Sequence, residues 1–305
     1  MAAKICGNVP RQCFQAARSD ALREEAAAAI LKGISEIEDI GTIMEGVRGY
    51  RLLPHHVFEI YPRHDTRNFS LCQFRLVSEW ALDQLLAEQD EREENGAYKF
   101  YQSIQSTTEA AGLRGQIWER RVHKYFRRIE PTTFQITSLD DRSTTFDIKM
   151  SGEMFKDFGS IQQFQGHLAT CVRAGQSGYL KPLSRSFATL VSLFYAHDFA
   201  EQGYQPLMGC QMTEAYTHSL SITGYETVQK SLKPSVPELA SLRPSTSMKW
   251  ITIFVVPEPM GQTFTKQSYK GTECKGQASR KTWDSRIAQF VLELNKDLVW
   301  GMKKV

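Results

Sequence analysis

Apolar and polar residues in the first third of the chain follow patterns that predict several helices and one short hairpin. Apolar residues recur at helical spacing in residues 19–40, and Ser19 is suited to cap that helix. Two alternating stretches separated by a polar loop predict a β-hairpin. We expect a mainly helical module, with helices at 19–40, 79–94 and 97–111 and the hairpin strands at 57–61 and 74–77.

From Gly112 onward, helical patterns alternate with strongly apolar stretches. The helix expected at 115–128 has an apolar stripe, and the run 186–196 is apolar on both faces, as in a strand that is covered on both sides. The pattern predicts an α/β fold, a mixed sheet flanked by helices. We expect strands at 134–139, 144–150, 186–196, 207–215 and 249–256, a helix or loop from 161, and helices at 224–233 and 283–299. The change of pattern divides the chain into domains 1–111 and 112–305.

Composition narrows the class of protein. The 305 residues are 41% hydrophobic and 23% charged, with a net charge of +3, which is ordinary globular usage. No run reaches the roughly 18 apolar residues of a membrane span, and the first residues lack the apolar core of a secretory signal. The six cysteines show no C-x-x-C spacing. We expect an intracellular protein, in the cytoplasm or nucleus, without a zinc site, disulfide framework or membrane partner.

Polar residues inside a buried pattern mark one candidate site. In a strand over 207–215, Gly209, Gln211 and Thr213 would lie on one face, and Met208, Cys210 and Met212 on the other. Two polar side chains would then point together out of a core strand. They are either a satisfied hydrogen-bonded set or the floor of a site. His218, shortly after this strand, is either a packing histidine or part of the same site.

The helix at 115–128 carries two further candidate features. Glu119 lies at the edge of its apolar stripe, where it can pair with an arginine or bind a metal ion. Basic residues crowd the same helix and form either a solvated face or a stripe that binds phosphates. The candidate nucleic-acid contacts are Arg120, Arg121, Lys124, Arg127 and Arg128.

Three segments in this order resemble a known family. Residues 115–123 (GQIWERRVH), the stretch from Pro182 to Ser192, and residues 210–218 (CQMTEAYTH) resemble the C-terminal nuclease-like domain of Crinkler and retrotransposon-hot-spot (RHS)-type effectors. Those proteins join a P-loop ATPase to a restriction-endonuclease-like, PD-(D/E)XK, domain. The resemblance implies a restriction-endonuclease-like mixed sheet and Mg²⁺-dependent phosphodiester hydrolysis. It also implies Glu119 and Gln211 as metal ligands, with Thr213 or His218 as polar support.

The chain departs from the family pattern at the catalytic positions. Val191 stands where the resemblance implies an aspartate, and Gln211-x-Thr213 stands where it implies E-x-K. Hard cations bind oxygen ligands, so a valine cannot replace the aspartate. We therefore expect impaired catalysis.

Residues 1–111 resemble the end of the family's ATPase module, in which an arginine such as Arg11 can sense nucleotide. The chain contains no G-x-x-x-x-G-K-[ST] motif, so we expect no ATP cofactor and infer an N-terminally truncated family member. A full-length ATPase–nuclease paralogue is then a candidate partner. Two hypotheses follow: an impaired nuclease-like domain that binds nucleic acid, or a protein-interaction adaptor or truncated gene product without nuclease or ATPase activity.

Overall fold

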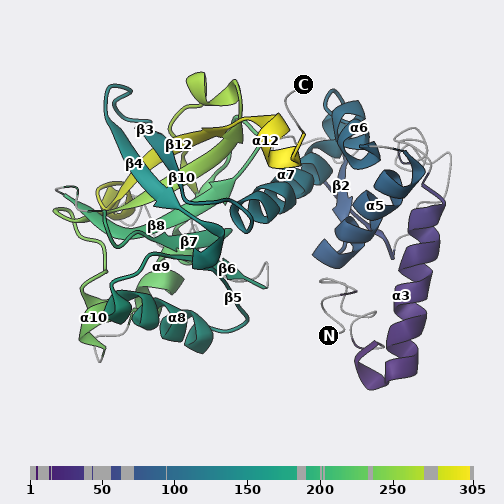
Figure 1. The fold of residues 1–305 in the computed structure, drawn as a ribbon, viewed down its shortest axis with the longest axis horizontal. Helices are drawn as coiled ribbons and strands as arrows, with labels where there is room; N and C mark the ends of the chain where they lie inside the picture. Colours follow the sequence, from purple (N-terminus) through teal and green to yellow (C-terminus); the bar gives the residue numbers. More distant parts are fainter. Residues whose placement is uncertain are drawn as a thin grey trace. The chain divides into compact units, whose positions relative to one another are not determined.

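The chain forms two compact units. The structure, a computed structural model, describes residues 16–37, 56–62, 72–93, 95–183, 190–199, 203–232, 236–270 and 281–302, with Ile5, Phe14, Ile43 and Glu201. Contacts divide the chain into two units, Met1–Arg120 and Arg121–Val305 (Figure 1). The division falls inside a helix, α7 (Ala111–Phe126). Arg11 lies outside the described residues.

Helices α3 (Asp20–Ser35) and α5 (Glu79–Arg92) dominate the first unit. The predicted N-cap is confirmed, since the Ser19 hydroxyl accepts a hydrogen bond from the Leu22 N–H at 3.2 Å. The helix ends earlier than residue 40, at Ser35, because the Arg92 guanidinium donates to the carbonyls of Ser35 and Ile37 and so satisfies free carbonyls at this end. One arginine therefore fastens the end of α3 to α5.

The helix predicted at 97–111 is wrong as a single element. The chain instead forms α6 (Gly96–Ser103) and a short 3-10 turn (Thr108–Ala110) before α7 begins. The residues between them, Gln105-Ser106-Thr107, include weak helix formers. The Arg114 guanidinium also donates hydrogen bonds to the carbonyls of Ile104 and Thr107, at 2.9 and 2.6 Å, which stabilises the interruption between the helices.

The predicted hairpin is confirmed. Strands β1 (Phe58–Pro62) and β2 (Cys72–Leu76) pair antiparallel, with Phe58 opposite Leu76. A glutamine of α7 acts as a further partner at the hairpin's end. The Gln116 side chain accepts from the Leu76 N–H at 2.8 Å and donates to its carbonyl at 2.9 Å, so both main-chain polar groups of Leu76 are satisfied in the buried interior.

The second unit is a mixed α/β fold around one sheet. Among the described residues eight strands pair in the order β4-β3-β12-β10-β8-β7-β6-β5. The central strands β8, β10 and β12 run parallel, whereas β7 and β8 pair antiparallel. The strands are β3 (Thr132–Ser138), β4 (Thr145–Met150), β5 (Phe155–Phe158), β6 (Gly178–Pro182), β7 (Ser192–Tyr195), β8 (Tyr204–Met212), β10 (Lys249–Pro257) and β12 (Ile287–Leu294).

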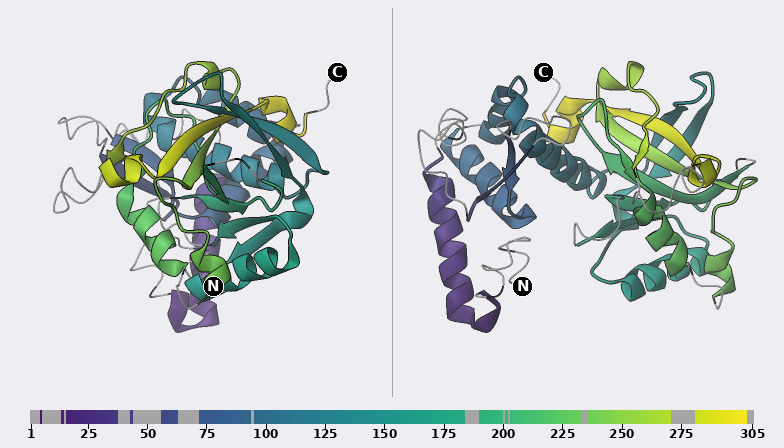
Figure 2. Two further views of the ribbon diagram at one scale, coloured as in Figure 1. Left: turned by 90° about the vertical axis from the view of Figure 1, so that its left-hand side faces the viewer. Right: turned by 180° about the vertical axis from the view of Figure 1, so that it is seen from behind.

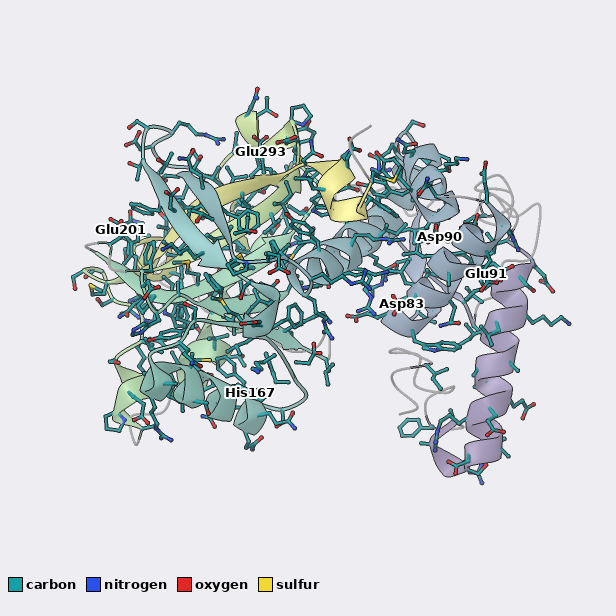
Figure 3. All side chains as sticks on the ribbon, viewed as in Figure 1. Asp83, Asp90, Glu91, His167, Glu201 and Glu293 are labelled. Carbon is teal, nitrogen blue, oxygen red and sulfur yellow. The ribbon has the colours of Figure 1, made fainter. Side chains whose placement is uncertain are left out.

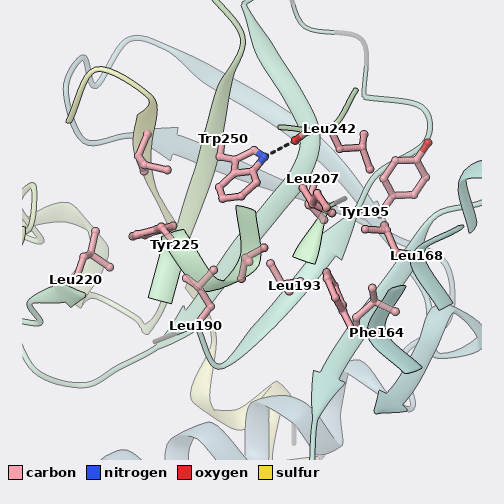
Figure 4. Packing of buried hydrophobic residues seen from close by; sticks show 14 of the residues in the cluster. Phe164, Leu168, Leu190, Leu193, Tyr195, Leu207, Leu220, Tyr225, Leu242 and Trp250 are labelled. Atoms are coloured by element: carbon pink, nitrogen blue, oxygen red, sulfur yellow. Dashed lines mark hydrogen bonds between the residues drawn. The ribbon is translucent and has the colours of Figure 1, made fainter. Parts of the chain in front are cut away.

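Three helices contribute to the main core on one side of this sheet, and Figures 1 and 2 show α8 and α10 on the same side. Their apolar side chains interlock with those of the central strands in the cluster of Figure 4. There the Trp250 indole donates to the Leu242 carbonyl at 2.7 Å, so the ring is buried without an unpaired N–H. The helices are α8 (Ile161–Ala174), α9 (Ile222–Ser231) and α10 (Pro237–Ala240). The unit also contains the 3-10 helices η2 (Gly152–Met154) and η3 (Met260–Gln262), the short strands β9 (Leu220–Ser221) and β11 (Tyr269–Lys270), and the short helix α12 (Lys296–Trp300).

The helix predicted at 283–299 is wrong. Residues Ile287–Leu294 form β12, which pairs parallel with β10 along its whole length, and only the short helix α12 follows. A buried parallel strand is apolar on both faces, so its side chains also satisfy a helical spacing by chance. Pairing with β10, which the local pattern does not report, decides the outcome.

Two other predicted strands are shorter or shifted. Within the run 186–196 the strand β7 spans Ser192–Tyr195, and residues 184–189 lie outside the described part of the chain. The strand predicted at 207–215 is β8, which starts earlier and ends at Met212. It ends there because the Thr213 hydroxyl accepts a hydrogen bond from the Ala215 N–H at 3.0 Å, which turns the chain.

Candidate functional site

The antiparallel pair β7–β8 brings two segments of the candidate site together. Ser192 lies opposite Cys210, and the N–H of the preceding residue, Val191, donates to the Cys210 carbonyl at 3.2 Å. Val191 and Gln211 therefore occupy the next positions of this pair. Gly209 permits the close approach, since a Cβ there would lie 2.8 Å from the Leu190 methyl groups.

Gln211 lies inside the sheet with one unsatisfied atom. The residue is 5% exposed, and its Oε1 has no hydrogen-bond partner among the described residues. A buried polar atom without a partner costs about 1–3 kcal/mol. Gln211 thus offers one neutral oxygen, while its half-buried neighbour Val191 offers only methyl groups.

Thr213 and His218 take part in local hydrogen bonds after β8. The Thr213 N–H donates to the Val255 carbonyl at 3.1 Å, and its hydroxyl accepts from Ala215. The His218 backbone N–H donates to the Gln267 Oε1 at 2.5 Å. These bonds fix the path of the chain beyond the strand. The sequence analysis missed Gln267, whose contact with His218 joins residues that are far apart in the chain.

Glu119 belongs to the first unit, where it is half-buried on α7, whereas Val191 and Gln211 belong to the second unit. The convergence of Glu119 with Gln211 stays a prediction.

Arg120 and Arg121, two of the candidate arginines, are each held by partners within their own unit. Arg120 binds both carboxylate oxygens of Asp83, with Nε 2.7 Å from Oδ1, and also contacts Glu79 at 3.3 Å; Asp83 is labelled in Figure 3. The Arg121 guanidinium lies 4.0 Å from the centre of the Trp300 ring. Bidentate and cation–π contacts of this kind hold guanidinium groups in fixed positions.

The basic residues at and just after the end of α7 have side chains that are more exposed to solvent. Arg127 pairs with Asp157 at 2.7 Å and lies over the Phe155 ring, yet its side chain is 51% exposed. Lys124 and Arg128 are exposed. Of the five predicted nucleic-acid contacts, Lys124, Arg127 and Arg128 are therefore the most accessible from solvent.

A buried network of hydrogen-bonded side chains, which the sequence analysis did not predict, links α7 to the candidate site. The Tyr179 hydroxyl lies 3.1 Å from His123 Nδ1 and 2.6 Å from the Ser192 Oγ. Ser192 in turn hydrogen-bonds the Cys210 thiol, while burial raises the pKa of this thiol to about 12. This buried network thus joins four elements, α7, β6, β7 and β8, next to Val191.

No group of three or more His, Cys, Asp or Glu side chains in the described part of the chain could hold a metal ion. Within the same residues, no helix has both the length and the apolar character needed to cross a bilayer. No family model, curated protein or solved structure matches the chain.

Proposed function

We propose that this chain is a restriction-endonuclease-like domain of the Crinkler/RHS type that binds nucleic acid without cutting it. One observation carries the proposal: the β7–β8 pair sets Val191 next to Gln211. These are the positions at which the resemblance implies metal-binding side chains. A valine and a neutral amide stand there instead.

These two residues do not fit Mg²⁺. A magnesium ion requires near-octahedral oxygen ligands that normally include carboxylates. Together Val191 and Gln211 offer a single neutral oxygen, and the Thr213 hydroxyl is already bonded to the Ala215 N–H. Neither residue supplies the negative charge that holds a hard divalent cation, so we derive no hydrolytic step.

Binding, in contrast, requires only accessible cations. Lys124 and Arg128 are exposed, and Arg127 keeps about half of its side chain in solvent while Asp157 orients it. Phosphate contacts of lysine and arginine supply sequence-independent affinity through the release of counterions. In this proposal these three residues contact the nucleic-acid backbone, while Arg120 and Arg121 hold the structure.

A second candidate function is a protein-interaction adaptor. The observation that favours it is the engagement of Arg120 with Asp83 and Glu79, and of Arg121 with Trp300, which removes two cations from the proposed phosphate stripe. The partner would be another protein, such as a full-length ATPase–nuclease paralogue. Adaptor function predicts no affinity for nucleic acid even at low salt.

One experiment separates these alternatives. End-labelled single-stranded and duplex DNA and RNA are incubated with the native chain or Glu119→Ala, with Mg²⁺, Mn²⁺ or a chelator, and both the mobility and the integrity of the probe are measured. We expect a mobility shift with intact probe for both proteins. Cleavage that Glu119→Ala abolishes would show an active nuclease, and the absence of a shift would favour the adaptor.

A further inference from the structure

The loop of residues 214–217, here called the Tyr216 loop, is held at both ends and exposed at its tip. Thr213 turns the chain at the start of the loop, and the His218 N–H is bound by Gln267 at its end. Between these points Ala215, Tyr216 and Thr217 are exposed, and Tyr216 is 61% exposed. The loop therefore presents an aromatic ring to solvent from an anchored main chain.

Gln267 is the anchor, and every polar group that it carries is used. Its side chain donates to the Tyr216 carbonyl at 3.0 Å and to the Thr265 carbonyl at 2.6 Å, and it accepts from His218. The residue is only 6% exposed. A buried amide whose bonds are all made fixes the main chain directly after the exposed ring.

A second buried glutamine holds the first. Gln289, fully buried in β12, accepts from the Gln267 N–H at 2.7 Å and donates to its carbonyl at 2.9 Å. The next residues add main-chain support, since the Leu220 N–H donates to the Ser268 carbonyl at 3.0 Å and β9 pairs with β11. The Tyr216 loop is thus tied to a central strand of the sheet through two amides in series.

The position of the loop is that of a ligand-binding loop. It follows the carboxyl end of β8, which runs parallel to β10 and β12, and ligands of α/β sheets bind outside the carboxyl ends of such strands. Loops held by a rigid scaffold carry binding residues more often than other segments do. An exposed tyrosine on such a loop offers a flat face on which any base can stack.

We propose that Tyr216 stacks on an unpaired nucleobase of a single-stranded nucleic acid, and that Gln267 and Gln289 are its positioning residues. This inference rests on the proposed function and adds to it the kind of nucleic acid that is recognised. Lys124, Arg127 and Arg128 would attract any nucleic acid, whereas Tyr216 would favour strands whose bases are unpaired.

The test compares two probes for each protein. Anisotropy gives the Kd of a labelled oligothymidine and of a strand of equal length that carries abasic sites. We expect the native chain to bind the base-containing strand about 10-fold more tightly, a preference that Tyr216→Ala abolishes and Tyr216→Trp retains. Leu298→Ala, which removes an exposed apolar side chain elsewhere, is the control and should keep the preference.

The results distinguish this inference from the proposed function. If the native chain binds neither probe at low salt, the proposed function fails. If it binds both probes equally, or if Tyr216→Ala keeps the preference for bases, the role of Tyr216 is wrong while nucleic-acid binding stands.

A double-mutant cycle tests the positioning role. Gln267→Met keeps the length of the side chain and removes its hydrogen bonds. We expect this variant to lose the preference for bases and to weaken binding no further in the Tyr216→Ala background. Equal losses in both backgrounds would show that Gln267 acts only on general stability and would overturn the positioning role.

Discussion

The Tyr179 hydroxyl lies 2.6 Å from the Ser192 Oγ, and the same hydroxyl lies 3.1 Å from His123 Nδ1. Tyr179 also stacks on Phe155, with ring centroids 5.0 Å apart. The start of β7, where Val191 meets β8, is therefore fastened to α7 through one buried phenol. Geometry at the candidate site depends on this bond as well as on strand pairing.

Tyr179→Phe should destabilise the second unit by about 1–3 kcal/mol, because it leaves His123 Nδ1 and Ser192 without their shared partner in a buried place. Urea denaturation gives the free energy of unfolding. Tyr216→Phe, which removes a hydroxyl from an exposed ring, should change it by less than about 0.5 kcal/mol. Equal effects of the two substitutions on the free energy of unfolding would contradict a stabilising role of the Tyr179 hydrogen bonds.

Val191→Asp tests whether the pair β7–β8 descends from a metal site. The new carboxylate would lie beside Gln211 and supply the missing negative ligand. We expect Mn²⁺ to raise the Tm of Val191→Asp by a few degrees and to leave the native protein unchanged. Val191→Asn matches the aspartate in shape without its charge. An increase in Tm of the same size in both variants would therefore contradict descent from a metal site.

Cys210 should resist thiol reagents in the folded protein. Burial raises the pKa of its thiol to about 12, so almost no thiolate exists at pH 8. Because the folded-state pKa lies above the ordinary value of 9.0, the stability from this thiol is complete below pH 9 and is lost as pH rises towards 12. Peptide mapping after alkylation at pH 8 should find Cys210 unmodified until denaturant is added; rapid labelling of the native chain would contradict its burial.

The exposed cations should carry the phosphate contacts. Lys124→Ala combined with Arg128→Ala should weaken binding to a labelled oligonucleotide by about 10-fold at 0.1 M salt and make the salt dependence shallower by about 1.5 in log–log slope. Arg120→Ala should have the smaller effect, since its guanidinium is bound to Asp83 and Glu79. The reverse order of effects would place the contact surface at Arg120 instead of at Lys124 and Arg128.

The sequence predicts elements well where local chemistry decides them. Ser19 caps α3 as expected, and the continuous apolar run at Lys249–Pro257 is the central strand β10. It fails for Ile287–Leu294, because an apolar run buried on both faces satisfies helix and strand spacing alike, and pairing with β10 decides.

The candidate site shows the same limit. The sequence points to Gln211, Thr213 and His218, which follow one another along the chain. It gives no sign that Gln267 binds the His218 N–H, since that bond joins residues separated by 49 positions. Gln289 stands out in the sequence as a glutamine inside an apolar run. Because the pattern predicts a helix there, its position as a buried polar residue of a strand is not recognised.

The most direct test of the central claim is the affinity of the native chain for a labelled single-stranded oligonucleotide, measured across salt concentrations with Mg²⁺ present. We predict binding at low salt, a log–log slope of about −2 for the three cations, and an intact probe at every point. Absent or salt-insensitive binding, or a probe that is cut, would contradict it.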